Sequence, residues 1–314
     1  MNIAKLAVSG PFSFENLSLF LVRGRDDFDG SRFLPLDQAM EQKCVIVHET
    51  GTVGQLEVEN LSDEWDLFVQ AGDVVKGGRQ DRTLGVDFVL PVKSGRVPVP
   101  SFCVESGRWH RRAGEQAESF SSSKSSLSSR RLRMAAKLSQ SQSEVWQTVA
   151  ETQQALSTSM QKEINAMMSP TSYQLSMEDT DLAERKVRYH EALAKVLDEA
   201  PDALGFAFAI NGEINTADVY GSNTLFRRLS AKLLDAAIVE AIAESSRATP
   251  QPPEVTAEAV RDWIAAGETG EVSNQQDVPP RVHVETRRST TSYRFDTHDR
   301  GLNDAVLHRN LVHS

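Results

Sequence analysis

The chain has 314 residues, with 39% hydrophobic and 25% charged residues, which is the composition of a folded globular protein. Its formal net charge of -10 argues against nucleic acid or an anionic membrane as a partner, because both need a basic surface. Cys44 and Cys103 are too few for a disulfide framework, and they lack the paired spacing of a thiolate zinc site. The first residues lack the apolar run of a signal peptide, and no later run approaches the length of a membrane span. We therefore expect a cytoplasmic protein with no membrane contact.

The first third of the chain is predicted to form an antiparallel sheet, because short apolar or alternating runs are separated by Gly, Asn, Asp and Ser. Leu56 and Val58 alternate with acidic residues and are expected to face a core. Pro98 and Pro100 restrict their strand to an edge or an irregular ladder, since proline has no backbone N–H. The predicted strands are 17–22, 44–48, 55–59, 65–69, 82–92 and 97–105, with a hairpin turn at 93–96 joining the last two.

A serine-rich and arginine-rich segment follows this sheet. Eight serines lie between Ser119 and Ser129, with arginines on both sides. This composition is typical of a mobile loop, and we interpret residues 113–140 as a linker. The predicted domains are then a β-rich N-terminal portion, 1–112, and a helix-rich α/β portion, 141–314.

The C-terminal portion carries the clearest local signal, an Asn211-Gly212 pair between two apolar runs, which favours a type I′ β-hairpin. Phe206 and Phe208 are predicted to face one side of this hairpin, while Ala207 faces a closely packed neighbour on the other side. Capping signals and apolar stripes predict helices from 141 to about 168, 181–200, 222–245 and 256–266, followed by a last hairpin at 281–286 and 290–295. The predicted fold class is α+β, with an N-terminal antiparallel β-sandwich or barrel-like sheet packed with the C-terminal α/β portion.

One turn between predicted strands combines glycines with side chains that bind oxyanions. Glycines allow backbone donors to approach a ligand closely, and arginine binds phosphate or carboxylate in a bidentate way. The turn therefore suits a phosphorylated or nucleotide-like ligand, although it matches neither the P-loop nor the dinucleotide pattern. The alternative is a tight structural turn in which the aspartate pairs with an arginine. The predicted ligand-binding residues of this turn are Gly77, Gly78, Arg79, Gln80 and Arg82, with Asp81 between them.

The end of the next predicted strand offers a second set of reactive side chains. Cys103 and Glu105 face the same side by strand periodicity, so a thiol nucleophile and a carboxylate base are one possible pair, with Asp81 as a further catalytic candidate. The alternative is an inert buried cysteine and a Glu105–Arg108 ion pair. Arg108 and Trp109 are additional ligand-binding candidates, the tryptophan as a stacking surface.

The seven histidines show no HxxxH, HxH or HExxH spacing, so the sequence predicts no metal site and identifies no cofactor. Asp296, His298 and Asp299 form a compact group between a predicted strand and a glycine. We interpret this group as turn chemistry.

Four segments together resemble the ARPP-1 domain, a family associated with ADP-ribosylglycohydrolases and rhodanese-phosphatases. They are GDVVKGGRQDR at 72–82, VPVPSFCVESGRW at 97–109, QSEVWQTV at 142–149 and LGFAFAINGEINTADVYGSNTLFRRLSAKLL at 204–234. The resemblance extends over most of residues 17–244, and it implies an ADP-ribose-like or phosphorylated ligand without assigning a catalytic residue. The positions of the family-like motif are Gly72, Gly77, Gly78, Gln80, Arg82, Cys103, Glu105, Gly107, Arg108 and Trp109.

Three functions follow from these patterns, and the residues do not decide whether the protein is an enzyme. The first is a cytoplasmic ligand-binding or regulatory domain for a phosphorylated, nucleotide-like molecule. The second is a hydrolase that uses Glu105 as general base. The third is a structural protein or homo-oligomer, in which the apolar stripe of the 145–168 helix pairs with a second subunit.

Overall fold

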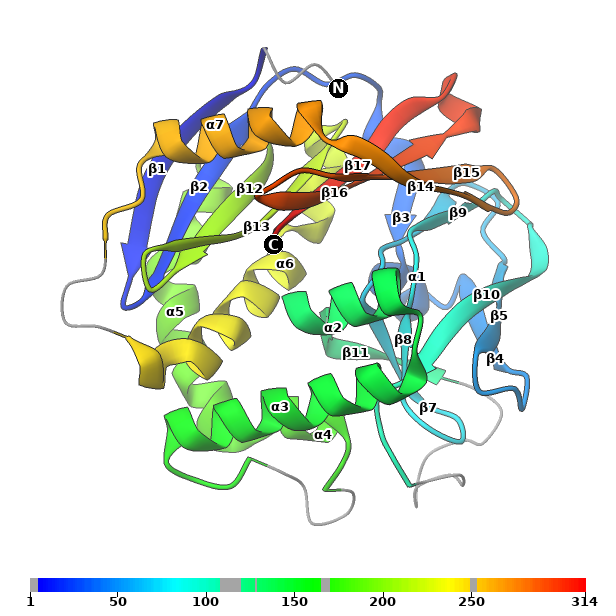
Figure 1. Cartoon of the computed structure of the whole chain (residues 1–314). Helices are drawn as coiled ribbons and strands as arrows, with labels where there is room; N and C mark the ends of the chain where they lie inside the picture. Colours follow the sequence, from blue (N-terminus) through cyan, green and yellow to red (C-terminus); the bar gives the residue numbers. More distant parts are fainter. Residues whose placement is uncertain (1–4, 108–119, 128, 165–169, 249–252) are drawn as a thin grey trace. The chain divides into compact units, whose positions relative to one another are not determined.

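A computed structural model describes residues 5–107, 120–127, 129–164, 170–248 and 253–314 (Figure 1). The chain forms two compact units. Unit 1 comprises Met1–Ser31 and Arg188–Ser314, and unit 2 comprises Arg32–Val187.

Unit 1 is built on one eight-stranded sheet with the order β1-β2-β12-β13-β17-β16-β15-β14, in which every neighbouring pair is antiparallel. The N-terminal hairpin thus joins the C-terminal strands through the pairing of β2 with β12. The strands are β1 (Ala7–Phe14), β2 (Leu17–Arg23), β12 (Ala203–Ile210), β13 (Glu213–Tyr220), β14 (Glu271–Val278), β15 (Val282–Arg288), β16 (Ser292–Asp299) and β17 (Ala305–His313).

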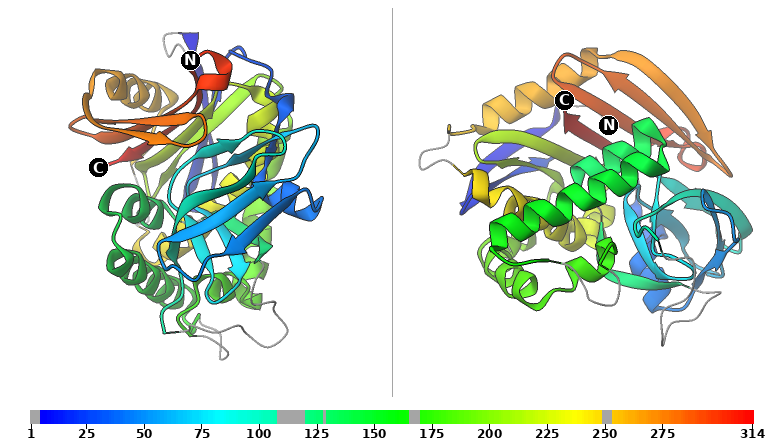
Figure 2. Two further views of the ribbon diagram at one scale, coloured as in Figure 1. Left: turned by 90° about the vertical axis from the view of Figure 1, so that its right-hand side faces the viewer. Right: turned by 60° about the horizontal axis from the view of Figure 1, so that its bottom comes forward.

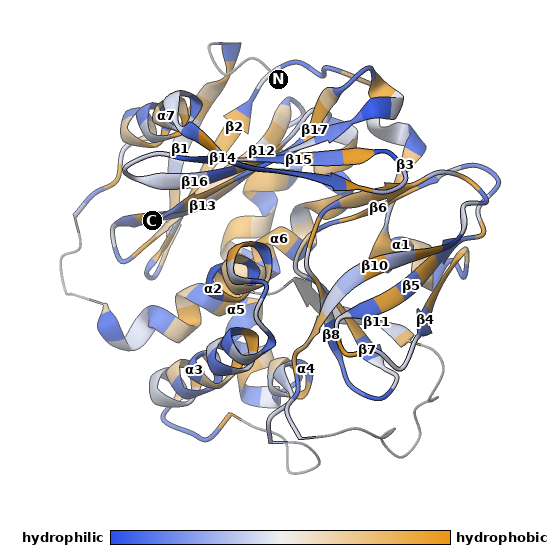
Figure 3. Cartoon of the chain, turned by 45° about the vertical axis from the view of Figure 1, so that its right-hand side comes forward, coloured by the Kyte–Doolittle hydropathy of each residue, from blue (hydrophilic) through white to orange (hydrophobic). Residues whose placement is uncertain are grey.

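Helices pack against both faces of this sheet. On one face, Trp263 of α7 (Ala257–Ala266) packs in the same core as Phe20 and Ala207. On the other face, Phe206 meets Phe226 of α6 (Asn223–Glu244) edge to face, with ring centroids 6.2 Å apart. This division follows from the alternation along β12, and it confirms the two faces predicted from the sequence. In Figure 3, β12 is hydrophobic along most of its length, whereas the edge strand β14 is mostly hydrophilic.

The predicted Asn-Gly hairpin is confirmed. Asn211 and Gly212 join β12 to β13 with φ values of 52° and 79°, and positive φ at both positions is what a type I′ turn requires. The Asn211 side chain also donates to the carbonyl of Glu244 at the end of α6 (3.0 Å), so the turn is tied to the helix that covers the sheet.

Two arginines and a carboxylate are buried together on the C-terminal strands. Asp296 of β16 accepts hydrogen bonds from Arg309 of β17 (Nε to Oδ1, 2.6 Å) and from Arg294 (Nε to Oδ2, 2.9 Å). All three residues are at most 5% exposed. The half-exposed Glu268 also contacts both guanidinium groups, at 3.1 Å to Arg294 and 2.6 Å to Arg309. The network ties two neighbouring strands to the turn that follows α7.

Unit 2 contains a six-stranded sheet with the order β11-β7-β8-β10-β5-β4 and a three-stranded sheet with the order β3-β6-β9. The edge strands of the larger sheet, β11 and β4, contact each other, so this sheet is a nearly closed barrel; its blue and cyan strands curl round in the right-hand view of Figure 2. The strands are β3 (Phe33–Pro35), β4 (Val45–Glu49), β5 (Gln55–Asn60), β6 (Asp66–Val69), β7 (Asp73–Gly77), β8 (Arg82–Leu84), β9 (Phe88–Leu90), β10 (Gly95–Cys103) and β11 (Phe120–Leu127).

The short predicted strands of this region are confirmed, and Leu56 and Val58 are fully buried. The predicted strand 82–92 is wrong, because it divides into β8 and β9, which belong to different sheets. Asp87 lies between them, and its carboxylate accepts from the backbone N–H of Ala71 (2.7 Å) instead of continuing a strand. The predicted hairpin at 93–96 is also wrong, since β9 pairs with β6 while β10 pairs with β5 and β8.

The irregular ladder predicted from the prolines is present. Residues 95–100 of β10 pair with β5, and residues 101–103 pair with β8. Pro98 and Pro100 lie in the first part, where β5 is the partner. The strand therefore changes neighbour where its prolines end.

The predicted linker differs from the structure wherever its residues are described. Residues 120–127 form β11, which pairs with β7, and α2 (Arg130–Met134) and a π-helical turn (Ala135–Ser139) follow. Backbone hydrogen bonds to β7 hold this segment in the sheet despite its polar composition. Residues 108–119 and 128 lie outside the described part of the chain.

The long amphipathic helix is present as α3 (Gln142–Met160), and the Ser141 side chain caps its first turn as predicted. Val145, Val149 and Leu156 of its stripe are buried within the chain, so these side chains do not present an exposed apolar face. The use of this stripe by a second subunit stays a prediction. The remaining helices are α1 (Leu36–Glu41), α4 (Tyr173–Met177) and α5 (Thr180–Asp198), which contains the boundary between the units.

The α+β class and the barrel-like N-terminal sheet are as predicted. The compact units nevertheless do not follow the predicted boundaries at 112 and 140, because the pairing of β2 with β12 places the first strands in the C-terminal unit. Among the described helices, none combines the length and the apolar character that a membrane crossing requires.

Candidate functional site

The candidate site lies at one end of the barrel-like sheet of unit 2, where the turn between β7 and β8 meets the end of β10 and the loop between β4 and β5. Gly77 and Gly78 have φ values of 124° and 55°. A Cβ atom on Gly78 would lie 2.5 Å from the ring of Phe120 and 3.0 Å from Oε2 of Glu49, so this position requires glycine both for its backbone and for space. The turn therefore approaches a carboxylate from the neighbouring loop at close range.

That carboxylate, Glu49 at the end of β4, accepts two backbone hydrogen bonds and forms an ion pair with a buried guanidinium. Its Oε1 accepts from the backbone N–H of Gly51 (3.0 Å), and its Oε2 accepts from the backbone N–H of Arg79 (3.2 Å). Nη2 of Arg82 lies 3.5 Å from Oε1. The Glu49 side chain is only 5% exposed. Two of the residues predicted to bind an oxyanion, Arg79 and Arg82, therefore contact a carboxylate of the chain itself. Binding of a separate ligand by the predicted set stays a prediction.

Arg82 is fully buried at the start of β8 and reaches across the end of the barrel. Its Nη1 donates to the carbonyl of Val53 in the β4–β5 loop (2.7 Å) and contacts Sγ of Cys103 on β10. Together with Glu49, these contacts fasten the β4–β5 loop onto the sheet. Residues 50–55 of that loop are all exposed, so the arginine is covered by a layer of surface chain.

Asp81 holds the turn together. One oxygen of its carboxylate accepts from the backbone N–H of Gly77 and the other accepts from the hydroxyl of Ser172, both at 3.0 Å. Its carbonyl accepts from the backbone N–H of Val104 (3.0 Å). Ser172 in turn caps α4 by accepting from Leu175 (3.1 Å). The tight structural turn inferred as an alternative is thus present, with a serine and a backbone amide as partners of the aspartate.

The end of β10 is buried beside this turn. Cys103 and Glu105 are both 0% exposed, and Gln80 donates from Nε2 to the carbonyl of Glu105 (2.9 Å). Gln142 at the start of α3 completes the pairing of this strand: it accepts from the backbone N–H of Cys103 and donates to its carbonyl, each at 2.8 Å. The predicted residues of the two segments therefore do lie next to each other.

The predicted site residues do not all reach one solvent-accessible place. Arg79 is exposed at the rim, and its guanidinium lies beside Gly51, where a built Cβ would be 3.6 Å from Nη1. Gln80 and Arg82 are buried under it. The Cys103 thiol contacts Arg82, whereas the Asp81 carboxylate is engaged by the turn, so a hydrolase built on these groups stays a prediction. Arg108 and Trp109 lie outside the described residues.

Sequence reasoning missed four residues that build this end of the barrel. Glu49 comes from the end of β4 and Val53 from the β4–β5 loop. Gln142 lies at the start of α3 and Ser172 at the start of α4. No local pattern marks any of them. Each contacts a residue that is distant in the sequence, so its role is visible only in the folded chain.

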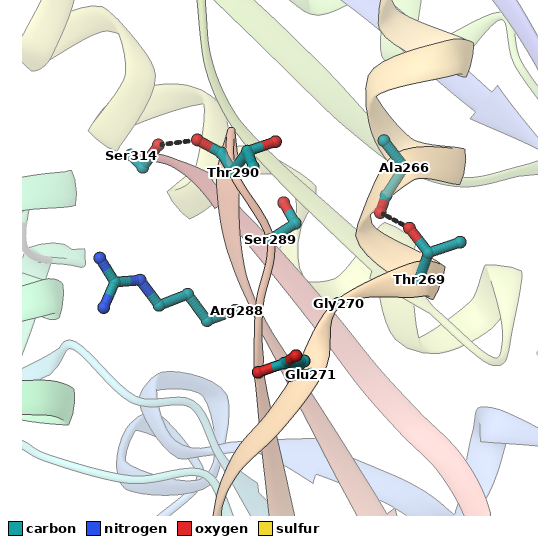
Figure 4. Close-up of a pocket in the computed structure, with 8 residues that line it drawn as sticks. All are labelled: Ala266, Thr269, Gly270, Glu271, Arg288, Ser289, Thr290 and Ser314. Atoms are coloured by element: carbon teal, nitrogen blue, oxygen red, sulfur yellow. Dashed lines mark hydrogen bonds between the residues drawn. The ribbon is translucent and has the colours of Figure 1, made fainter.

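A groove in unit 1 is the alternative place for a ligand (Figure 4). It has a volume of about 620 Å³ and lies between the end of α7 and the turn that joins β15 to β16. Its two charged side chains, Glu271 and Arg288, are exposed and belong to cross-strand partners. None of the predicted site residues lines it, and none of its charged groups is buried. The residues that line it are Ala266, Thr269, Gly270, Glu271, Arg288, Ser289, Thr290 and Ser314.

The compact group at 296–299 separates in the structure. Asp296 belongs to the buried arginine network, and Asp299 accepts from Arg281 (2.7 Å) and caps the turn at Gly301 (2.9 Å). His298 points to a different neighbour, His283 on β15. The interpretation of the group as turn chemistry therefore holds for Asp299, which accepts from the turn, and is wrong for Asp296 and His298, which lie within β16.

Comparison with known proteins agrees with the resemblance noted in the sequence. The family model of the ARG and Rhodanese-Phosphatase-superfamily-associated Protein domain, ARPP-1, matches residues 5–313. No curated protein and no solved structure matches the chain. Because the family model covers both units, from β1 to β17, the match is not confined to the glycine-rich turn. The chain belongs to the ARPP-1 domain family.

Proposed function

We propose that the protein is a cytoplasmic ligand-binding domain for a phosphorylated, nucleotide-like molecule, and that the ligand binds at the glycine-lined end of the barrel. One observation carries this proposal: two backbone N–H groups and a buried guanidinium converge on the carboxylate of Glu49. Such a set of donors is a binding site for an oxyanion. In this proposal Glu49 occupies the position that a phosphate oxygen takes when the ligand is bound.

The surroundings of Glu49 suit an exchange of one anion for another. The loop 50–54, which covers Arg82, is exposed along its whole length. It is fastened by the Val53 carbonyl, which accepts from Arg82 (2.7 Å), and by the Gly54 carbonyl, which accepts from the backbone N–H of Ser101 (3.1 Å). Movement of this loop uncovers the guanidinium. Arg79 stands exposed at the rim, where a second phosphate group of the ligand meets a positive charge. A ligand with two phosphates therefore contacts both arginines.

The nucleotide part of the proposal rests on the family. The description of the domain links it to ARG, the ADP-ribosylglycohydrolases, and to the rhodanese-phosphatase superfamily. ADP-ribose, with its two phosphates, is thus the first ligand to test.

Thermal shift with the whole chain tests this function. We expect ADP-ribose to raise the Tm of the wild type, because a ligand that binds only the native state stabilises it. ADP and ribose 5-phosphate are expected to raise it less, and ribose not at all. Arg79→Ala is expected to weaken ADP-ribose binding about tenfold, which corresponds to ~1.4 kcal/mol, because it removes an exposed charge that faces the ligand phosphate.

The matched control is Arg96→Ala. Arg96 is an exposed arginine near the start of β10, whereas the site lies at the end of that strand, and its contacts with Glu57 and Glu59 are both 3.9 Å. This variant is expected to bind ADP-ribose as the wild type does. Absence of a Tm shift with every phosphorylated compound, or equal weakening in the two variants, would remove the proposal.

A further inference from the structure

Two histidines and an aspartate at one end of the sheet of unit 1 form a group that the proposed ligand site does not use. His283 on β15 and His298 on β16 are direct cross-strand partners, so both side chains project from the same face of the sheet. Their rings are stacked, with centroids 4.6 Å apart and an interplanar angle of 6°. Asp304, in the turn before β17, lies next to both rings.

Asp304 contacts each histidine with a different group. Its Oδ1 lies 3.3 Å from Nδ1 of His283, and its backbone carbonyl lies 3.1 Å from Nδ1 of His298. A carbonyl oxygen only accepts, so Nδ1 of His298 carries the proton. In the neutral ring, Nε2 of His298 then has the free lone pair. A histidine whose other ring nitrogen donates to a backbone carbonyl is the usual arrangement of a metal ligand.

We infer that His283, His298 and Asp304 form a binding site for a divalent transition-metal ion of the zinc class. One ligand atom from each residue lies within 4.8 Å of the others. Bonds of about 2.0–2.2 Å to a tetrahedral ion place two ligand atoms roughly 3.3–3.5 Å apart. The His283–Asp304 separation of 3.3 Å already has this value, so an ion fits between these two ligand atoms. The two rings are nearly parallel, so the His298 ring must rotate out of the stack to direct its lone pair at the same ion.

The backbone around the three residues is fixed by hydrogen bonds. The backbone N–H of Asp304 donates to the carbonyl of Asp299 (3.1 Å), and Asp304 itself has a φ of 65°. The ladder between β16 and β17 shifts its register between Thr297 and His298, so the regular pairing is interrupted beside the site.

The neighbouring cations have their own carboxylate partners. Arg281 pairs with the buried Asp299 at 2.7 Å, and Arg300 pairs with Asp277. The charge of Asp304 is therefore available to a bound cation. With two imidazoles and one carboxylate, the site favours Zn²⁺, Ni²⁺ or Cu²⁺ over Mg²⁺ and Ca²⁺, which prefer oxygen ligands. The ion would connect β15, β16 and the turn before β17.

Titration calorimetry with ZnCl₂ on the whole chain, first stripped with EDTA, tests the inference. We expect one saturable Zn²⁺ site per chain and no binding of Mg²⁺ at the same concentration. His283→Gln and His298→Gln are each expected to weaken Zn²⁺ binding by more than about tenfold, because even an outer-shell partner of a metal ligand contributes that much. Asp304→Asn keeps a residue that tolerates a positive φ, and it is expected to weaken binding as well.

His48→Gln is the matched control. His48 is also a half-buried strand histidine beside a carboxylate, at 3.1 Å from Glu59, but it has no second histidine as a partner. This variant is expected to bind Zn²⁺ as the wild type does. The Tm of each variant in EDTA shows that it is folded. Absence of saturable binding in the wild type, or unchanged binding in folded Asp304→Asn and His298→Gln, would overturn the site.

Discussion

Replacing Asp296 with alanine is expected to lower the free energy of unfolding by about 3–5 kcal/mol, because it leaves two buried guanidinium groups without their shared carboxylate. Arg294 and Arg309 are 5% and 3% exposed, so water does not replace the lost partner. Glu268 stays in contact with both arginines, but it is 43% exposed and binds them from the surface. Urea unfolding of the wild type and the variant measures the difference.

The control for this prediction is Asp262→Ala, which removes an exposed aspartate paired with Arg261 on the surface of α7. Its expected effect is below about 1 kcal/mol, since exposed ion pairs contribute little. Equal effects of the two substitutions would show that the buried network does not stabilise unit 1.

The same network predicts a dependence of stability on pH. Burial by itself raises the pKa of Asp296, but the hydrogen bonds and charges of Arg309 and Arg294 outweigh it, so the pKa lies below its ordinary value. A carboxyl group with a lowered pKa stabilises the folded state above its unfolded pKa of about 3.9, and this contribution is lost as the pH falls through the folded value. The gap in stability between the wild type and Asp296→Ala is therefore expected to shrink below about pH 4.

Arg82→Met is expected to destabilise the protein by a similar amount, about 3–5 kcal/mol, because it leaves Glu49 buried without its cation and releases the loop carbonyl of Val53. Combining it with Glu49→Gln removes both charges together. The double variant is expected to recover more than half of the lost stability. Urea unfolding of the four proteins gives the coupling energy between the two residues.

Arg96→Met, an exposed arginine on β10, serves as the comparison and is expected to cost less than about 1 kcal/mol. If the effects of Arg82→Met and Glu49→Gln simply add, the two side chains are not an energetic pair. The conclusion that Glu49 and the buried Arg82 stabilise each other would then be wrong.

Local signals were sufficient for much of the fold. The Asn211-Gly212 turn, the capping serine at 141 and the alternation at Leu56 and Val58 each depend on neighbours in the sequence, and each is found as predicted. The segment 82–92 was predicted as one strand because apolar residues stand on both sides of Gly85 and Asp87. What divides it is the hydrogen bond between Asp87 and Ala71, a contact between loops.

The C-terminal strand β17 was not predicted, and the reason is chemical. It buries His308, Arg309 and Asn310, three polar residues that interrupt any apolar pattern. Their partners are carboxylates on other strands: Asp218 of β13 accepts from His308 (3.0 Å) and Asn310 (2.9 Å), and Asp296 accepts from Arg309. A polar strand of this kind becomes buried only when its partners are in place, which no local pattern reveals.

The candidate site was predicted only in part, because one of its main groups comes from a segment distant in the sequence. The glycines and arginines of the turn mark it as an oxyanion-binding segment, and its nearness to Cys103 and Glu105 follows from two adjacent strands. The oxyanion itself, Glu49, comes from the end of β4, which reaches the turn through the curvature of the whole barrel. The curvature of the barrel depends on all six strands of the sheet. The sequence of the turn alone therefore does not predict its contact with Glu49.

The most direct test of the ligand site is a calorimetric titration of ADP-ribose into the wild type and into Glu49→Gln. If the carboxylate competes with a ligand phosphate for Arg82 and the backbone donors, removing its charge tightens ADP-ribose binding. We expect a gain of about tenfold, equivalent to ~1.4 kcal/mol, with one site per chain. Glu57→Gln, on the neighbouring strand β5, is expected to leave the affinity unchanged. Equal or weaker binding by a folded Glu49→Gln protein would contradict the claim that Glu49 holds the place of the ligand.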